Sequence, residues 1–79
     1  MNIPKIAELL IREYAGASNK FPPFRSVHEG LGIIEEEFEE LKHEIFKKKS
    51  ERSIARMRKE ASHLGAMAMR FIYDICEEH

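Results

Sequence analysis

Two stretches of helical periodicity on either side of one polar turn restrict this chain to a pair of antiparallel helices. The apolar residues of the first stretch are Val27, Leu31, Ile34, Phe38, Leu41 and Ile45, and those of the second are Ile54, Met57, Ala61, Leu64, Ala68, Phe71 and Ile75. Steps of three and four are typical of helices that pack along their whole length. The polar run 47–52 separates the two apolar seams. We therefore predict helices over residues 27–48 and 51–77, with a turn at Ser50 that also caps the second helix.

The segment before this hairpin carries its own start and stop signals. Ser26 and Glu29 have the S-x-x-E spacing of a capping box, in which each side chain satisfies a backbone N–H at a helix start. Gly16 and the prolines at 22 and 23 predict the end of a short amphipathic helix over residues 3–17. Phe21 and Phe24 are expected to hold the intervening loop against the body. The predicted fold is all-α: a short N-terminal helix plus a long antiparallel hairpin, in one domain over residues 1–79.

The composition narrows the class of protein. A chain of 79 residues buries a limited share of its surface, so we expect a homodimer or homotetramer in which the helices form a bundle. Acidic and basic residues number 14 and 13, which argues against binding nucleic acid through overall charge. One cysteine, Cys76, excludes an intrachain disulfide and fits the cytoplasm. No signal peptide and no apolar run of about 20 residues is present, so no membrane association is predicted.

A second stripe, one position to the side of each seam, carries potential metal ligands. Glu36-Glu37-x-x-Glu40 lies in the first predicted helix, and Glu60-x-x-His63 lies in the second. In an antiparallel pair, Glu37 comes level with His63 and Glu40 with Glu60, because the residue numbers in each pair have the same sum. Residues three apart lie on one helical face with Cβ atoms about 5–6 Å apart. These four residues are therefore expected to face one another.

Clustered carboxylates that are partly buried require a cation among them, because two unit charges 4 Å apart repel by about 4 kcal/mol at an effective dielectric of 20. Lysine or arginine side chains of the same helices could supply it, which would make the cluster a salt-bridged surface. Alternatively, such oxygen-rich sets suit Mg²⁺ or Mn²⁺, which keep water ligands and take substrate phosphates. A third interpretation is a di-iron carboxylate bundle, in which two copies of the chain combine Glu60 and His63 with Glu37 or Glu40.

The ordered motifs resemble those of the MazG-like all-α nucleoside triphosphate pyrophosphohydrolases, in their short phage-type branch. Members of that family carry E-E-x-x-E on one helix and E-x-x-D on the next. This chain has Glu36-Glu37-Phe38-Glu39-Glu40 and then Glu60-Ala61-Ser62-His63. The resemblance includes the stretches 24–30 and 66–72 and covers residues 20–75, which is nearly the whole chain.

The resemblance implies Mg²⁺-dependent hydrolysis of a nucleoside triphosphate to a monophosphate and pyrophosphate. It makes Glu37, Glu40 and Glu60 metal ligands, and it makes Glu36 a supporting carboxylate or water-orienting base, so that Glu36 and Glu37 are the candidate catalytic residues. His63 stands where the family has aspartate, and a neutral nitrogen ligand suits Zn²⁺, Mn²⁺, Fe²⁺ or Ni²⁺ better than Mg²⁺. This departure leaves open a weakened or inactive relative that serves as an oligomeric binding or structural protein.

Three further residues are candidates for contact with the substrate. Arg56 and Arg70 share the flanking stripe with Glu60, so their charges are expected to face the phosphates. His28 could reach a phosphate or base, and a loop-tethering role is an equal alternative beside the capping box.

Overall fold

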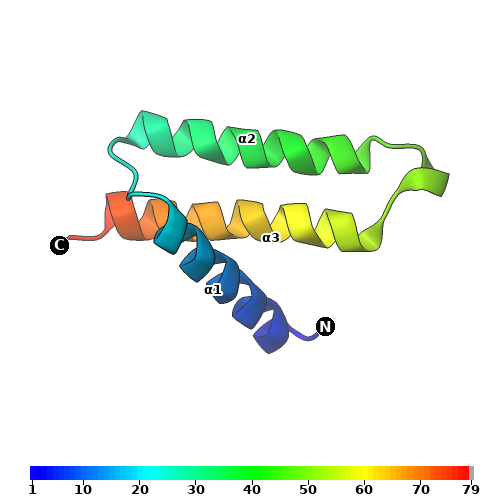
Figure 1. Cartoon of the computed structure of the whole chain (residues 1–79), viewed down its shortest axis with the longest axis horizontal. Helices are drawn as coiled ribbons and strands as arrows, with labels where there is room; N and C mark the ends of the chain where they lie inside the picture. The colour runs from blue at the N-terminus through cyan, green and yellow to red at the C-terminus, as the bar shows by residue number, and fades with distance from the viewer. Residues whose placement is uncertain (79) are drawn as a thin grey trace.

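The computed structural model describes residues 1–78, which form an all-helical chain without β-strands. Helix α1 spans Ile3–Lys20, α2 spans Val27–Ile45 and α3 spans Ile54–Phe71. A 3₁₀ turn, η1 (Lys49–Glu51), joins α2 to α3, and a π-helical segment, η2 (Ile72–Cys76), extends α3. Figure 1 shows α2 and α3 side by side and antiparallel, with α1 crossing below α3. The predicted all-α class and helical hairpin are confirmed, and both hairpin helices lie within the predicted ranges.

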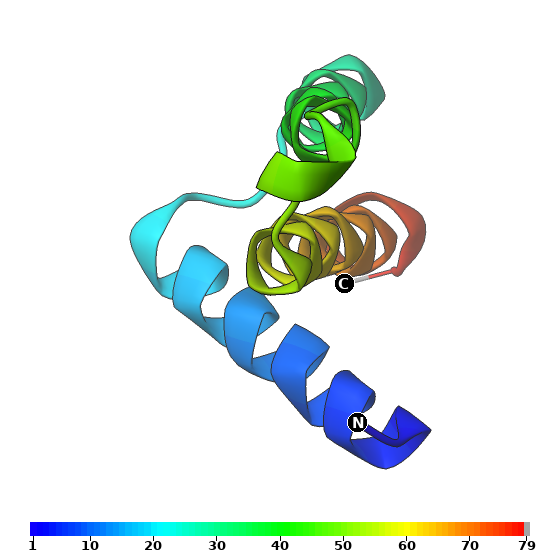
Figure 2. The same ribbon diagram turned by 90° about the vertical axis from the view of Figure 1, so that its right-hand side faces the viewer.

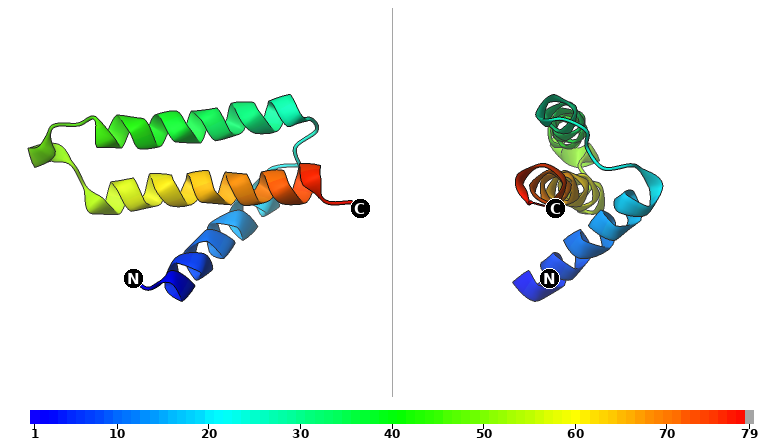
Figure 3. Two further views of the ribbon diagram at one scale, coloured as in Figure 1. Left: turned by 180° about the vertical axis from the view of Figure 1, so that it is seen from behind. Right: turned by 90° about the vertical axis from the view of Figure 1, so that its left-hand side faces the viewer.

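Helix α3 is central, because α1 and α2 each pack against it (Figure 2). The long hairpin gives the molecule extents of 46 × 28 × 19 Å, and α1 diverges from it towards the N-terminus (Figure 3). Two glycines permit close contact at these interfaces. A Cβ at Gly65 would lie 2.8 Å from Leu10 Cδ2 of α1, and a Cβ at Gly30 would lie 2.6 Å from Phe71 Cδ2 of α3. Within residues 1–78, no helix combines the length and apolar character needed to cross a membrane.

The start of α2 uses half of the predicted capping box. Ser26 Oγ accepts a hydrogen bond from the Glu29 backbone N–H at 3.0 Å. The Glu29 carboxylate accepts from the backbone N–H of Arg25 at 3.1 Å and from its guanidinium at 2.7 Å. The serine cap is therefore confirmed, whereas the glutamate stabilises the residue that precedes the cap.

Three predicted boundaries are wrong by about one turn, and one of them is the end of α2, which lies at Ile45 instead of residue 48. Helix α3 begins after Ser53, whose hydroxyl accepts a backbone N–H at 3.2 Å, because Ser50 lies inside the 3₁₀ turn. Helix α1 continues through Gly16 to Lys20. A glycine inside a helix costs only about 0.5–1 kcal/mol relative to alanine, so the tandem prolines that follow decide where the helix ends.

The apolar seam of α2 is only partly buried, contrary to the arrangement expected for a packed core. Ile34 packs against the hydrophobic core, whereas Leu31 and Phe38 remain 50% and 51% exposed. The adjacent stripe is also mixed, because Gly30 is buried and Glu40 is exposed. Helix α1 packs against α3, so part of the α2 seam stays uncovered within residues 1–78.

The linker between α1 and α2 is attached to the C-terminal part of α3 and to η2. The backbone N–H of Phe24 donates to Asp74 Oδ2 at 2.9 Å, and Arg70 Nη2 donates to the Pro22 carbonyl at 2.7 Å. The Arg70 guanidinium also lies 4.5 Å from the centre of the Phe24 ring, and both side chains are buried. Phe24 thus holds the loop as predicted, whereas Phe21 is 58% exposed and does not.

Candidate metal centre

The four predicted ligands converge between α2 and α3. Glu37 and Glu40 come from α2, Glu60 and His63 come from α3, and one potential ligand atom of each lies within 4.8 Å of the others. His63 Nδ1 is 3.9 Å from Glu37 Oε2 and 3.8 Å from Glu60 Oε2. The antiparallel register expected from the sequence therefore brings together the four residues that can hold a cation.

Two of the carboxylates are largely buried, and one oxygen of each has no hydrogen-bond donor. The side chains of Glu37 and Glu60 retain 20% and 17% exposure. In each, Oε2 is buried and has no hydrogen-bond partner among residues 1–78. Burial raises the pKa of Glu37 and of Glu60, and the nearby Glu40 carboxylate raises both further, while His63 acts in the opposite direction. Buried acceptor oxygens normally have a partner, and a bound cation would provide one here.

The donor set fits a small divalent cation. Around an octahedral Mg²⁺ with ligands at about 2.1 Å, adjacent ligand atoms lie about 3 Å apart and opposite ones about 4 Å apart. Atoms already within 4.8 Å reach such distances through small side-chain movements. Carboxylate oxygens suit Mg²⁺ and Mn²⁺, and the imidazole nitrogen extends the range to other transition metals.

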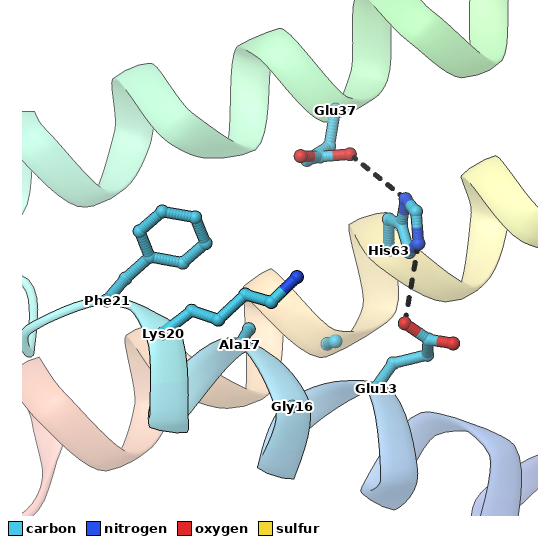
Figure 4. A pocket seen from close by; sticks show the side chains of 8 residues that line it. Glu13, Gly16, Ala17, Lys20, Phe21, Glu37 and His63 are labelled. Atoms are coloured by element: carbon cyan, nitrogen blue, oxygen red, sulfur yellow. Dashed lines mark ion pairs between the residues drawn. The ribbon is translucent and has the colours of Figure 1, made fainter.

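Two cavities border Glu37. One has a volume of about 390 Å³, and its lining includes Phe21, Phe24, Met67 and Arg70. The other has a volume of about 280 Å³ and faces α1. Figure 4 shows this second cavity, in which Lys20 extends from α1 towards the space beside Glu37 and His63.

The remaining predicted site residues lie at different distances from the cluster. Glu36 and Arg70 line the 390 Å³ cavity next to Glu37. Arg70 is 4% exposed and already donates to a backbone carbonyl, so its charge is held in one place. His28 and Arg56 are exposed and are not among the described residues that line this cavity.

Two residues of α1 border the site although sequence reasoning did not select them. Glu13 Oε2 lies 3.4 Å from His63 Nε2, on the side of the ring away from Glu37, and Lys20 lines the same cavity. Neither residue belongs to a motif with the four ligands. The available signal was the amphipathic pattern of α1, which places Glu13, Ala17 and Lys20 on one helical face.

Comparisons of the chain with family models, with curated proteins and with solved structures found no match.

Proposed function

We propose that this protein is a metal-dependent nucleoside triphosphate pyrophosphohydrolase. The observation that carries the proposal is the convergence of Glu37, Glu40, Glu60 and His63 around two buried oxygens that lack a donor. Mg²⁺ or Mn²⁺ fits these donors, and the order of the motifs resembles that of MazG-like enzymes. The reaction converts a nucleoside triphosphate and water into a nucleoside monophosphate and pyrophosphate.

We assign a separate role in this reaction to each of several residues around the cluster. A divalent cation, when bound, supplies positive charge against the phosphates and activates water. Glu36, which lines the 390 Å³ cavity beside Glu37, accepts a proton from the attacking water. The water oxygen forms a bond to the α phosphorus, the bond from that phosphorus to the α–β bridging oxygen breaks, and pyrophosphate leaves. Lys20 and Arg25 line the two cavities and offset negative charge on the departing group.

The larger cavity supports a nucleoside ligand. Its volume of about 390 Å³ falls within the range of small-molecule sites, about 300–1,000 Å³. Phe21 borders both cavities and is 58% exposed, so its ring is available to stack on a base. Met67 adds a polarisable apolar surface to the same cavity. An exposed aromatic ring next to a carboxylate cluster suits a nucleotide with its cation, because the ring can stack on the base while the carboxylates hold the cation.

A homodimer or homotetramer belongs to the same proposal. The seam of α2 exposes Val27, Leu31 and Phe38, and Ile54 of α3 and Ile72 of η2 are exposed as well. Helices with such an uncovered apolar stripe gain stability when a second copy completes a bundle. Sedimentation velocity of the whole chain tests this part, and a monomer at micromolar concentration would refute it.

The enzyme proposal is tested by pyrophosphate release from a panel of canonical and modified nucleoside triphosphates with Mg²⁺ or Mn²⁺. Glu37→Gln and Glu40→Gln are expected to lower the rate by at least about 100-fold, because each removes a charged ligand. Glu39→Gln is the matched control, since Glu39 is an exposed neighbour on the same helix that approaches Lys42 at 4.0 Å. Absence of release with any metal, or release unaffected by both ligand substitutions, would refute the proposal.

Two alternatives use the same residues and give different results. His63 in place of the family's aspartate favours a binding or structural protein, which would bind metal and nucleotide without releasing pyrophosphate. The pair Glu60 and His63 favours a di-iron protein, which would develop an oxo-bridged absorption band when loaded with Fe²⁺ and exposed to oxygen. A protein that stays colourless after this treatment excludes the di-iron alternative.

A further inference from the structure

His63 lies between carboxylates that come from all three helices. Its Nδ1 faces Glu37 of α2 and Glu60 of α3, at 3.9 and 3.8 Å. Its Nε2 faces Glu13 of α1 at 3.4 Å, and Figure 4 shows the ring between Glu13 and Glu37. A neutral imidazole has one N–H donor and one acceptor nitrogen, so it can donate towards only one of these two sides.

The two nitrogen atoms of the His63 ring face different numbers of carboxylates. On the Nδ1 side, Oε2 of Glu37 and Oε2 of Glu60 are both buried without a donor. A proton on Nδ1 could serve only one of these oxygens, whereas a cation can bind both of them and the Nδ1 lone pair. On the Nε2 side stands a single carboxylate, at the shortest of the three distances. All three carboxylates and both ring nitrogens have a partner when the proton is on Nε2 and a cation lies beside Nδ1.

We propose that Glu13 is a positioning residue for the metal centre. Its carboxylate accepts the Nε2–H of His63, which orients the ring and directs the Nδ1 lone pair to the cation held by Glu37, Glu40 and Glu60. This inference rests on the metal centre of the proposed function. Histidine ligands commonly donate their second N–H to a carboxylate, which fixes the tautomer and strengthens the ligand. The cation of this site is then a nitrogen-binding divalent transition metal, such as Co²⁺, Zn²⁺ or Mn²⁺.

The fold holds Glu13 in place independently of its contact with His63. The residues that follow it in α1, Tyr14 and Ala17, pack against the hydrophobic core. Leu10 occupies the space beside Gly65 of α3, which limits sliding of α1 along α3. This packing of α1 therefore places the backbone of Glu13 beside His63, and the Glu13 side chain is 36% exposed.

Co²⁺ titration of the whole chain, followed by visible absorption, tests the proposal without any hydrolysis reaction. Glu13→Ala is expected to weaken Co²⁺ binding about 10–100-fold and to change the absorption spectrum. Glu8→Ala is the matched control, because Glu8 is an exposed carboxylate on the same helix that pairs with Lys5. The control is expected to bind Co²⁺ within about twofold of the parent. Equal binding by Glu13→Ala and the parent would overturn the inference.

A double-mutant cycle determines whether Glu13 acts through His63. In a His63→Asp background, Glu13→Ala is expected to have no weakening effect, since the ring that it orients is absent. The same loss in both backgrounds would show an effect of charge or folding and would overturn the proposal.

The tautomer of His63 in the unsubstituted protein gives a check that needs no folded variant. With Zn²⁺ bound, long-range ¹H–¹⁵N correlation at about pH 8 should show the proton on Nε2, and a proton on Nδ1 would overturn the inference.

Failure of this inference is distinguishable from failure of the proposed function. If Co²⁺ binds through His63 and Glu13 but no nucleotide is hydrolysed, the positioning role stands and the enzyme proposal falls. If the parent hydrolyses nucleotides and Glu13→Ala binds Co²⁺ unchanged, the enzyme proposal stands and the positioning role falls.

Discussion

Replacement of Glu37 by glutamine should stabilise the metal-free protein while it removes metal binding. In the absence of a cation, the Oε2 atoms of Glu37 and Glu60 are buried with no donor, and the two carboxylates come within 4.8 Å of each other. Glutamine keeps the size of the side chain and removes the charge, so the repulsion disappears. A gain in stability together with a loss of ligand binding is the signature of a site that is strained without its ligand.

The magnitude follows from the distances in the cluster. At a separation of 4.8 Å, two unit charges repel by about 3.5 kcal/mol at an effective dielectric of 20. Both side chains keep some contact with water, so we reduce this value by about half, to roughly 2 kcal/mol. For a domain of this size, that difference raises the melting temperature by about 8–16 °C.

The raised pKa of Glu37 determines how the stability of the metal-free parent changes with pH. Burial raises the pKa of Glu37 in the folded state, so the folded protein favours the protonated side chain. The metal-free parent is therefore relatively most stable below the ordinary carboxyl pKa, and it loses this stability as the pH rises through the raised value. The advantage of Glu37→Gln should consequently be absent near about pH 4 and should grow as the pH rises through the raised pKa.

The assay is thermal unfolding followed by circular dichroism in chelator-treated buffer, with Glu39→Gln as the surface control. The variant should melt about 8–16 °C above the parent at pH 7, and the control should melt within about 2 °C of it. A Glu37→Gln variant that melts at or below the parent temperature at pH 7 would refute the electrostatic reasoning.

The remaining predictions concern the cation, His63 and the glycine at the α2–α3 contact. Mn²⁺ at about 100 times its dissociation constant should add about 2.7 kcal/mol to the parent, or roughly 10–20 °C in melting temperature, and should leave Glu37→Gln unaffected; an equal shift in both proteins would place the ion elsewhere. His63→Asp should shift the preference in a metal-binding titration towards Mg²⁺, and an unchanged preference would show that His63 is not a ligand. Gly30→Ala should cost about 1–3 kcal/mol in urea unfolding, because its Cβ would lie 2.6 Å from Phe71. Gly32→Ala, which meets nothing within 4 Å, should add about 0.5–1 kcal/mol, and destabilisation of similar size by both substitutions would contradict the packing argument.

Much of the fold and the central cluster could be predicted from local patterns. Periodicity and the polar run near residue 50 specified two antiparallel helices, since apolar spacing of three and four suits only one regular structure. Antiparallel pairing around a short turn then placed Glu37 level with His63. An error of a few residues in the start of α3 left this register intact, because the η1 turn at Lys49–Glu51 is centred close to the predicted position.

The rotation of each helix and the crossing of α1 depend on contacts between residues far apart in the chain. The apolar seam and the carboxylate stripe of α2 are neighbours on the helix surface, and local spacing favours the apolar one as the packed face. In the structure the two stripes share the packed face, because Gly30 lies beside Phe71 and Ile34 packs against the core, while Phe38 stays exposed. The sequence by itself thus determined which segments are helical and which ligands are level with one another, because both follow from local periodicity. Only the tertiary structure decided which residues of each stripe are buried and that α1 brings a carboxylate to His63, because both depend on side-chain packing between separate helices.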